Sequence, residues 1–547
     1  MPAEPHLEAH GRFRRCIWNW ACEVNATCMR QKGFSAGNFH TGFAARSIVP
    51  RWPGDIEATG GLGPRSASGT RLADILTPDL CVIGAGSGGL AVAELARAYG
   101  ASVILVEKGR LGGSSLNIGA IPAKALAAAG AHARAMRDGP AFGITVDEPR
   151  VNFRRVHDHV EQVITALTPQ SSAARLTALG VEVIEGTARF VSPKAIAVGD
   201  TEIAARRFVI ATGSRPVVPP IPGLDAVPYF TPDTILDNTR KLTHLVVIGA
   251  GAVAIELAQA YGRLGSEVTV VANGEFLPGV DPELAAVALA RLAEEGVHLE
   301  PHAAVTAIQA RSMGIGVLVR TGESDRLLDA SHLLVAGERM PNLDGLDLDK
   351  AGIRFEKAGQ GRLHLGPDLR TSNARVYAVG DVAGSQSVAS ATRDAQTVVR
   401  RALLGILARP DPVAPRLVST DPGIAEVGLN EAAARRRHGI GFRVTRWAFA
   451  DNDHARATRE TCGLVKLITD RRGRIVGAGV VGPGASELVA LFSLAMSAGI
   501  PAARLAAMTV PYPSYAEIAV RLGSELRRRE VGHPLARAWM SVVRLLG

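Results

Sequence analysis

Short apolar runs alternate with glycine turns and helical patterns along most of this chain. Leu80–Ile83 is an unbroken apolar run, and a glycine turn and an alanine-rich helical pattern follow it. The next apolar run, Ser102–Val106, ends at an acidic residue. Short apolar runs bounded by turn residues are typical of strands buried on both faces of a parallel sheet. The segment therefore predicts a β–α–β unit.

A second unit of the same kind begins at His244–Ile248. A glycine turn and a helical pattern follow, and the chain returns as the run Glu267–Val271. Two such units predict two dinucleotide-binding domains. From about Pro415 strands and helices alternate, and a polar helix is expected after Pro513. The apolar stretch Glu487–Ile500 is too short to cross a membrane and is expected to form a buried interface helix.

Residues 1–75 differ from the rest of the chain. They carry three of the five cysteines, Cys16, Cys22 and Cys28, and show no sustained periodicity. Six-residue steps match no common zinc pattern, so no metal site is predicted. Scattered acidic residues and the lack of an apolar core disfavour a cleavable targeting peptide. A disordered extension, or a start codon placed too early, is the preferred interpretation.

The formal net charge of +9 is concentrated at the two ends of the chain. Residues 1–75 hold nine basic and six acidic residues, a net charge of +3. Residues 521–547 hold six basic and two acidic residues, a net charge of +4. The nearly neutral body disfavours a nucleic-acid-binding face. The few cysteines argue against an oxidised extracellular protein. The sequence contains no run of about twenty apolar residues, so we predict no transmembrane helix. We predict a cytoplasmic protein.

The first glycine turn has the features of a pyrophosphate-binding loop. Gly84, Gly86 and Gly89 directly follow the first strand. Such glycines permit a tight turn and a close approach of the backbone to a pyrophosphate at the helix N-terminus. Glu107 lies at the end of the next strand, where a carboxylate accepts hydrogen bonds from ribose hydroxyls. Together these residues predict a dinucleotide site.

The segment Gly112–Lys124 carries a family resemblance. It reads Gly-Gly-Ser-Ser-Leu-Asn-Ile-Gly-Ala-Ile-Pro-Ala-Lys. It resembles the stretch Gly-Gly-Thr-Cys-Leu-Asn-Val-Gly-Cys-Ile-Pro-Ser-Lys of the pyridine nucleotide-disulfide oxidoreductases, such as lipoamide dehydrogenase and glutathione reductase. Ser115 and Ala120 stand where that family has its redox cysteines, and neither side chain forms a thiolate or a disulfide. Cys81 and Cys462 fall at no thiol position of the family.

The resemblance runs from about Leu76 to Gly523 and implies non-covalently bound FAD together with NADH or NADPH. It includes the family's Ala-Thr-Gly-Ser segment and its Gly-Asp motif. The residues expected at the FAD site are Gly84, Gly86, Gly89, Glu107, Lys108, Gly112, Gly113, Ser114, Ala211, Thr212, Gly213, Gly380 and Asp381. Those expected at the NAD(P) site are Gly249, Gly251, Ala252, Val253 and Ala254.

The implied fold is α/β, with two Rossmann-like domains and a C-terminal α+β dimerisation domain that makes the protein a homodimer. The expected parts are an N-terminal extension (1–75), the first part of the FAD-binding domain (76–215), the NAD(P)-binding domain (216–335), the second part of the FAD-binding domain (336–412), the dimerisation domain (413–525) and a basic amphipathic tail (526–547).

The choice between NADH and NADPH stays open. Ala272 stands where NAD-preferring relatives carry an acidic residue for the ribose 2′-hydroxyl. The arginines that bind a 2′-phosphate in NADP-preferring relatives are also missing. Glu275 could reach back toward the ribose.

The resemblance also implies catalytic positions. Lys124 and Glu256 match a Lys–Glu pair beside the flavin N5, and Ala252 replaces the aromatic lid of many relatives. Tyr512 stands where the family has its acid–base histidine, while the accompanying Glu517 is kept. A tyrosine, with a reference pKa of about 10, does not replace histidine as a base at neutral pH.

The leading hypothesis is an FAD-dependent NAD(P)H oxidoreductase that reduces a non-disulfide acceptor, such as a quinone, a second nicotinamide or another small molecule. The alternatives are a flavin-binding sensor or partner protein, slightly favoured by Ala272 and Glu338, and a disulfide reductase, disfavoured at positions 115, 120 and 512. A mercuric reductase would need the same cysteines and a C-terminal thiol pair. The segment Arg527–Leu546 is either an interfacial helix on an anionic membrane or a solvated basic helix.

Overall fold

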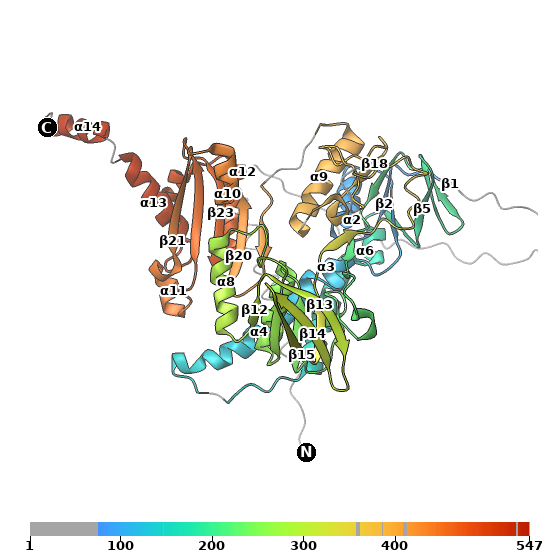
Figure 1. Cartoon of the computed structure of the whole chain (residues 1–547). Coiled ribbons are helices and arrows are strands. Elements are labelled where there is room, and N and C mark those ends of the chain that lie inside the picture. Colours follow the sequence, from blue (N-terminus) through green and yellow to red (C-terminus); the bar gives the residue numbers. More distant parts are fainter. Residues whose placement is uncertain are drawn as a thin grey trace, which may run out of the picture. The chain divides into compact units, whose positions relative to one another are not determined.

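The computed structural model describes residues 75–145, 147–356, 361–385, 387–407, 413–531 and 534–545. Cys16, Cys22 and Cys28, and the rest of the expected extension before residue 75, lie outside them. Residues 71–547 form one compact unit. Figure 1 shows its helices and strands in sequence colours.

The first predicted unit forms a five-stranded parallel sheet in the order β18-β8-β2-β3-β4. Apolar side chains fill both faces, and helices α2 and α9 pack against each other beside it. The strands are β2 (Leu80–Ile83), β3 (Val103–Glu107), β4 (Val181–Glu185), β8 (Arg207–Ile210) and β18 (Val376–Ala378), and the helices are α2 (Ser87–Ala98) and α9 (Val388–Leu404).

Smaller elements complete this part of the chain. A four-stranded sheet has the order β1-β7-β6-β5, and β17 pairs with β9. The strands are β1 (Ile75–Leu76), β5 (Ala188–Ser192), β6 (Ala195–Val198), β7 (Thr201–Ile203), β9 (Ser214–Pro216) and β17 (Arg339–Pro341). The helices are α3 (Gly113–Asn117), α4 (Ala120–Asp138), α5 (Phe153–Leu167) and α6 (Ala173–Ala178), with short 3-10 turns η1 (Gly139–Phe142), η2 (Thr168–Ser171) and η5 (Gly380–Ala383).

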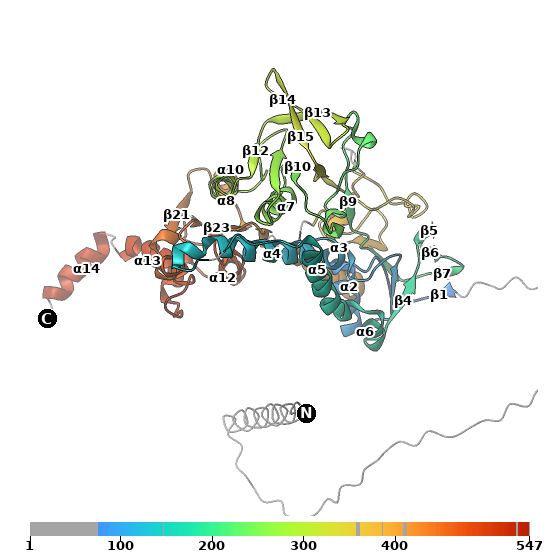
Figure 2. The same ribbon diagram turned by 90° about the horizontal axis from the view of Figure 1, so that it is seen from below.

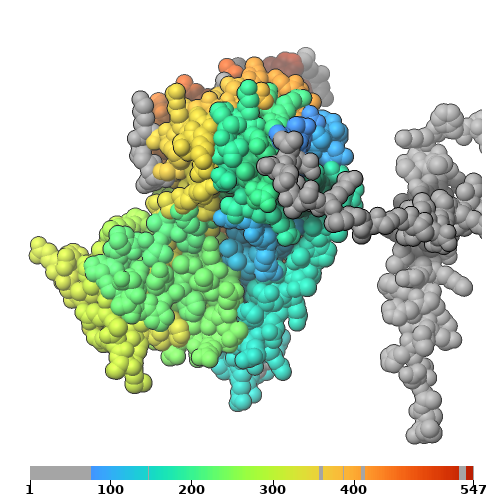
Figure 3. Space-filling model, turned by 90° about the vertical axis from the view of Figure 1, so that its right-hand side faces the viewer, coloured from blue at the N-terminus to red at the C-terminus, as the bar shows by residue number. Residues whose placement is uncertain are grey.

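The second predicted unit forms a four-stranded parallel sheet in the order β12-β11-β10-β16. Its strands are β10 (His244–Ile248), β11 (Glu267–Val271), β12 (His298–Glu300) and β16 (His332–Val335), with helices α7 (Ala252–Arg263) and α8 (Pro282–Glu294) and turns η3 (Leu224–Ala226) and η4 (Ile235–Asp237). An antiparallel sheet, β13 (Ala303–Ala310), β14 (Ile315–Thr321) and β15 (Ser324–Ala330), follows β12. Its yellow-green tip is visible in Figure 3.

The C-terminal part is an antiparallel sheet in the order β19-β20-β23-β22-β21 with helices around it. The strands are β19 (Arg416–Val418), β20 (Gly423–Gly428), β21 (Phe442–Ala448), β22 (Leu464–Asp470) and β23 (Ile475–Gly482). The helices are α10 (Glu431–His438), α11 (Asp453–Thr458), α12 (Ala485–Ser497), α13 (Glu517–Val531) and α14 (Pro534–Leu545), with turns η6 (Phe449–Asp451) and η7 (Ala502–Ala507).

These sheets confirm the predicted α/β fold class. The apolar stretch near residue 490 is α12, which buries Leu488 and Phe492 but leaves Leu494 66% exposed. α13 runs to Val531, past the expected start of the tail at residue 526, because Leu526 is buried with the C-terminal core. Within the described residues, no helix is long and apolar enough to cross a membrane.

Helix α4 brings the two nucleotide-type units together. It packs along α5 and α7, and Figure 2 shows these helices side by side. The approach to α7 is close at Gly130, where an added Cβ would lie 3.2 Å from the Ala260 carbonyl oxygen. This contact places the first turn of α4, which carries Lys124, near the α7 helix that carries Glu256.

Candidate active site

The first glycine turn is built so that only glycine fits. Gly84 has φ +106°, and an added Cβ would lie 2.4 Å from the Ala211 carbonyl oxygen. An added Cβ on Gly89 would lie 1.9 Å from the Gly84 carbonyl oxygen. Gly86 is the N-cap of α2, and no side chain caps this helix end. The first-turn N–H groups of α2 are thus left for a ligand such as pyrophosphate.

A cavity of about 670 Å³ begins at this turn. It is lined by most of the residues that the sequence predicts for FAD: Gly84, Gly86, Glu107, Lys108, Gly113, Ser114, Ala211, Thr212, Gly213, Gly380 and Asp381. Gly89 and Gly112 are not in the lining. Gly89 packs beneath the turn, and Gly112 has a left-handed φ of 92° that starts α3.

Glu107 is held in place by three backbone donors. Its Oε2 accepts a 2.6 Å hydrogen bond from the Ala85 N–H, and its Oε1 accepts from the Lys108 and Gly109 N–H groups at 2.9 and 2.8 Å. A carboxylate has about four lone-pair positions, so it can still accept hydrogen bonds from ribose hydroxyls. The glycine cradle and the oriented carboxylate fit FAD.

A polar network that the sequence did not predict completes the cavity wall. The Ser214 hydroxyl donates to Asp381 at 2.5 Å, and the Arg339 Nε donates to the Ser214 Oγ at 2.9 Å. Arg339 also donates to Asp233 at 2.8 Å. Ser214 belongs to the Ala-Thr-Gly-Ser segment, so a signal for it existed, whereas no sequence pattern marks Asp233. Asn342 and Asp344 also line the cavity.

Ser115 and Ala120 both line this cavity, Ser115 from α3 and Ala120 from the start of α4. The described part of the chain contains two cysteines, Cys81 and Cys462, and neither lines the cavity. Cys81 is fully buried in β2, and burial raises the pKa of its thiol. Cys462 is exposed before β22, and partial burial raises the pKa of its thiol as well. Neither thiol is activated for redox chemistry.

Glu256 is a half-buried carboxyl group. Burial raises its pKa to about 7, against the opposing effects of the Ser419 N–H, which donates to Oε1 at 2.6 Å, and of the Lys124 charge. Lys124 itself is exposed. In the part of the chain that the structure describes, Lys124 and Glu256 form no ion pair within 4.0 Å. The two groups therefore interact through their charges rather than through a direct contact.

The second glycine turn is as tight as the first at its first glycine and differs from it at its third position. Gly249 has φ +155°, and an added Cβ would lie 2.2 Å from the Ala336 carbonyl oxygen. The third position of the turn is Ala254, which is fully buried. A Cβ added to Gly249 would lie 3.4 Å from the Ala254 Cβ. Gly251 caps α7 without a side-chain hydrogen bond, and Val253 is 45% exposed. A nucleotide can approach Gly251, Ala252 and Val253.

The end of β11 presents no acidic side chain. Ala272 is buried, and both its backbone groups are bonded to neighbouring strands. Glu275 lies three residues further on, at 3.0 Å from His302 Nε2 in an exposed pair. A carboxylate is thus present near the turn, but it is paired with histidine.

Tyr512 and Glu517 lie in the C-terminal domain and do not line the cavity of their own chain. Tyr512 is 71% exposed and donates to Asp453 at 3.0 Å, which raises the pKa of the phenol. Glu517 begins α13, with Arg521 3.8 Å away.

Comparison with known proteins agrees with this geometry. Residues 78–397 match the pyridine nucleotide-disulphide oxidoreductase family, and residues 414–522 match its dimerisation domain. The chain belongs to this family. Its members use FAD and NADH or NADPH, which confirms the predicted cofactors. The presence of a dimerisation domain supports the expected homodimer.

Relatives in this family have different acceptors. The chain is 32% identical over 456 residues to a mercuric reductase of Streptomyces lividans, covering 82% of this chain and 95% of that protein. It is 33% identical over 453 residues to a dihydrolipoyl dehydrogenase of Geobacillus stearothermophilus, covering 80% and 94%. The HOCl-induced flavoprotein disulfide reductase RclA from Escherichia coli has a similar structure, with a TM-score of 0.72, 27% identity and coverage of 82% and 99%.

Proposed function

We propose that this protein is an FAD-dependent NAD(P)H oxidoreductase that delivers electrons to a small non-disulfide acceptor, such as a quinone or a second nicotinamide. The observation that carries the proposal is the pair Ser115 and Ala120 in the cavity wall. The sequence resemblance aligns these two residues with the family's redox cysteines. A serine hydroxyl and an alanine methyl cannot relay electrons to a disulfide.

Bound FAD would supply the hydride and electron-transfer chemistry between the nicotinamide and the acceptor. The chain's own residues would position and tune this exchange. Glu107 would hold the ribose, and the N-terminus of α2 would hold the pyrophosphate. Ala252, which has no bulky side chain, leaves the approach to the nicotinamide open at the N-terminus of α7. Lys124 brings a positive charge to this side, where it favours a negatively charged reduced cofactor.

The acceptor binds beside Ser115 and Ala120. In the proposed homodimer, Tyr512 and Glu517 reach this place from the second subunit. Because its hydrogen bond to Asp453 raises the pKa of Tyr512, the phenol stays protonated at neutral pH. A phenol has a single proton to donate, so Tyr512 donates to a carbonyl oxygen of the acceptor only when this bond replaces the one to Asp453, and it does not act as a base.

A flavin-holding sensor is the second candidate. The buried Ala272 favours it, because β11 ends without a carboxylate for the ribose of a nicotinamide nucleotide. Glu338 stands at the glycine of the relatives' Ala-Thr-Gly-Arg segment, and it lines a second cavity of about 510 Å³. The presence of Lys124 and Glu256, which match the family's catalytic pair, argues against the sensor.

The test is an anaerobic titration of the FAD-loaded protein with NADH and, separately, NADPH, following flavin absorbance. The proposal predicts bleaching by at least one nucleotide at a rate that supports turnover. The sensor predicts retained FAD without such bleaching. Turnover of lipoamide or glutathione disulfide by the wild-type protein would favour the disulfide reductase instead.

A further inference from the structure

The last two helices differ in how they meet the rest of the chain. α13 buries a stripe of apolar residues in the C-terminal core, namely Ile518, Ala519, Leu522 and Leu526. In α14 (red in Figure 1), by contrast, every described side chain from 538 to 545 is exposed. The described side chains of α14 thus do not take part in the C-terminal core that α13 joins.

The exposed surface of α14 is largely apolar. Its exposed large apolar residues are Trp539 (66%), Met540, Val542, Val543 and Leu545 (85%). A helix of about twelve residues is marginal in water by itself, so most of its stability must come from burying such residues. A contiguous apolar surface of this kind marks a binding site.

The distribution of these residues favours a lipid surface over a protein groove. With 3.6 residues per turn, the five positions spread over more than half of the helix circumference, whereas packing on protein needs a stripe of roughly 100°. Arg544 lies in the remaining sector. In the sequence a second arginine, Arg537, precedes Arg544 by seven residues. The segment 521–547 carries a net charge of +4.

We propose that α14 binds the surface of an anionic membrane, with its apolar residues among the acyl chains and its arginines at the phosphate headgroups. This inference goes beyond the proposed function and does not depend on it. At about 1.5 Å per residue, α14 is roughly 18 Å long, which is shorter than a hydrocarbon core of about 30 Å. The helix therefore lies in the interface rather than across the bilayer.

The experiment uses the full-length, FAD-loaded protein with vesicles of phosphatidylcholine, with and without phosphatidylglycerol. Cosedimentation measures binding, and the difference in emission between wild type and Trp539→Phe isolates the Trp539 signal. Val542→Ser and Arg544→Glu are the test variants. Ile440→Ser and Arg436→Glu are matched controls, since both residues are exposed and lie outside α14. Sedimentation velocity without vesicles reports the oligomeric state.

We expect binding to the phosphatidylglycerol vesicles, a blue shift of Trp539, and binding at least about tenfold weaker in Arg544→Glu and clearly weaker in Val542→Ser. The control variants should bind like wild type. Absent binding, equal binding to uncharged vesicles, or binding unaffected by the α14 variants would overturn the proposal. Loss of the dimer in those variants, without vesicle binding, would instead assign α14 to the second copy of the chain.

Discussion

At the scale of single residues, the cavity contains groups that fit a flavin, and in the proposed function it lacks those that would carry electrons to a disulfide. Glu107 is fixed by three backbone N–H donors. Ser115 and Ala120 sit in the same wall without a thiol. Tyr512 donates to Asp453 and has a raised pKa. The substitutions agree with one another, because a site without thiolates needs no histidine to protonate them.

Restoring the cysteines tests this interpretation. Ser115→Cys with Ala120→Cys should add a reducible disulfide but little lipoamide turnover, because Tyr512 does not act as a base at neutral pH. Adding Tyr512→His should raise that turnover by at least about tenfold, as general acid–base catalysis usually contributes more than this. Thiol titration checks that the disulfide forms. Efficient turnover in the double variant would show that Tyr512 is no obstacle.

Glu256 predicts a specific pH dependence of stability. Its folded pKa of about 7 exceeds the ordinary value of 4.5, so the folded protein binds this proton more tightly than the unfolded chain. The stability that Glu256 provides is present below pH 4.5 and falls as pH rises toward 7. The melting temperature of Glu256→Gln relative to that of wild type should therefore rise between pH 5 and pH 8. The corresponding change in the free energy of unfolding is roughly 2–4 kcal/mol.

Melting curves across this pH range, with the exposed Glu182→Gln as control, measure the effect. A constant difference between Glu256→Gln and wild type would mean that the Glu256 pKa is ordinary.

At the scale of elements, the two glycine turns share a tight first position and differ at the third. A Cβ on Gly84 or on Gly249 would collide with a backbone oxygen, and so would one on Gly89, whereas the second turn accommodates Ala254 at the position that corresponds to Gly89. The positions of both turns were predictable, because a strand, a glycine turn and a helix are local in sequence. The Arg339–Asp233 pair was not, because it joins residues 106 positions apart that no shared motif links.

Gly84→Ala should abolish FAD binding. The substitution puts a Cβ 2.4 Å from the Ala211 carbonyl oxygen at a φ of +106°, which a side chain rarely adopts. The isolated protein should lack flavin absorbance and melt at a lower temperature. Gly274→Ala is the control, because an added Cβ there meets nothing within 4 Å. Full flavin content in Gly84→Ala would show that the turn is not the cofactor cradle.

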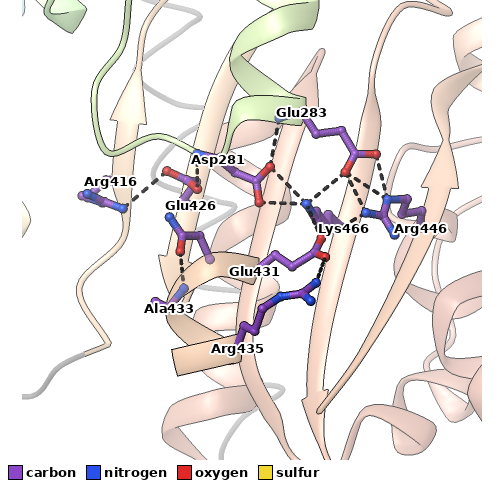
Figure 4. Close-up of polar contacts among 10 residues, drawn as sticks. Asp281, Glu283, Arg416, Glu426, Glu431, Ala433, Arg435, Arg446 and Lys466 are labelled. Carbon is purple, nitrogen blue, oxygen red and sulfur yellow. Dashed lines mark hydrogen bonds and ion pairs between the residues drawn. The ribbon is translucent and has the colours of Figure 1, made fainter. Parts of the chain in front are cut away.

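An ion network joins α8 to the C-terminal sheet (Figure 4). The Lys466 Nζ, on β22, is 4% exposed and lies 2.8 Å from Asp281 and 2.9 Å from Glu283 and Glu431. Arg446 on β21 also pairs with Glu283 and Glu431. Lys466 thus bridges three carboxylates from two parts of the chain.

Removing this cation should be costly. Lys466→Met leaves the buried Asp281 unpaired, and loss of one partner of a buried pair typically costs about 3–5 kcal/mol. Lys350→Met is the control, because Lys350 forms an exposed pair worth less than about 1 kcal/mol. Thermal melting of the FAD-loaded variants compares them. Equal melting temperatures would mean that the network does not hold α8 to the sheet.

The same network predicts acid sensitivity. Arg446 and then Lys466 lower the pKa of Glu283 to about 2, below its ordinary 4.5. Its contribution to stability is therefore present above pH 4.5 and is lost as pH falls toward 2. Lys466→Met should flatten this decline in melting temperature, while Lys350→Met should leave it unchanged.

At the scale of the whole molecule, the chain keeps the family's two nucleotide-type sheets and its dimerisation domain. The sequence predicted this architecture because each unit has its own apolar strands and turn. The domain boundaries stay predictions. The tail is expected to begin at residue 526, which lies within α13, and there the arginines at 527–529 resemble a solvated tail while Leu526 is buried in the C-terminal core.

The central claim is that electrons leave this protein without passing through cysteine. The most direct test is to reduce the FAD-loaded protein anaerobically with one equivalent of NADH or NADPH and to mix it in a stopped-flow instrument with a quinone or with lipoamide. The account predicts rapid return of flavin absorbance with the quinone and none with lipoamide. Reoxidation by lipoamide as fast as by the quinone would contradict it.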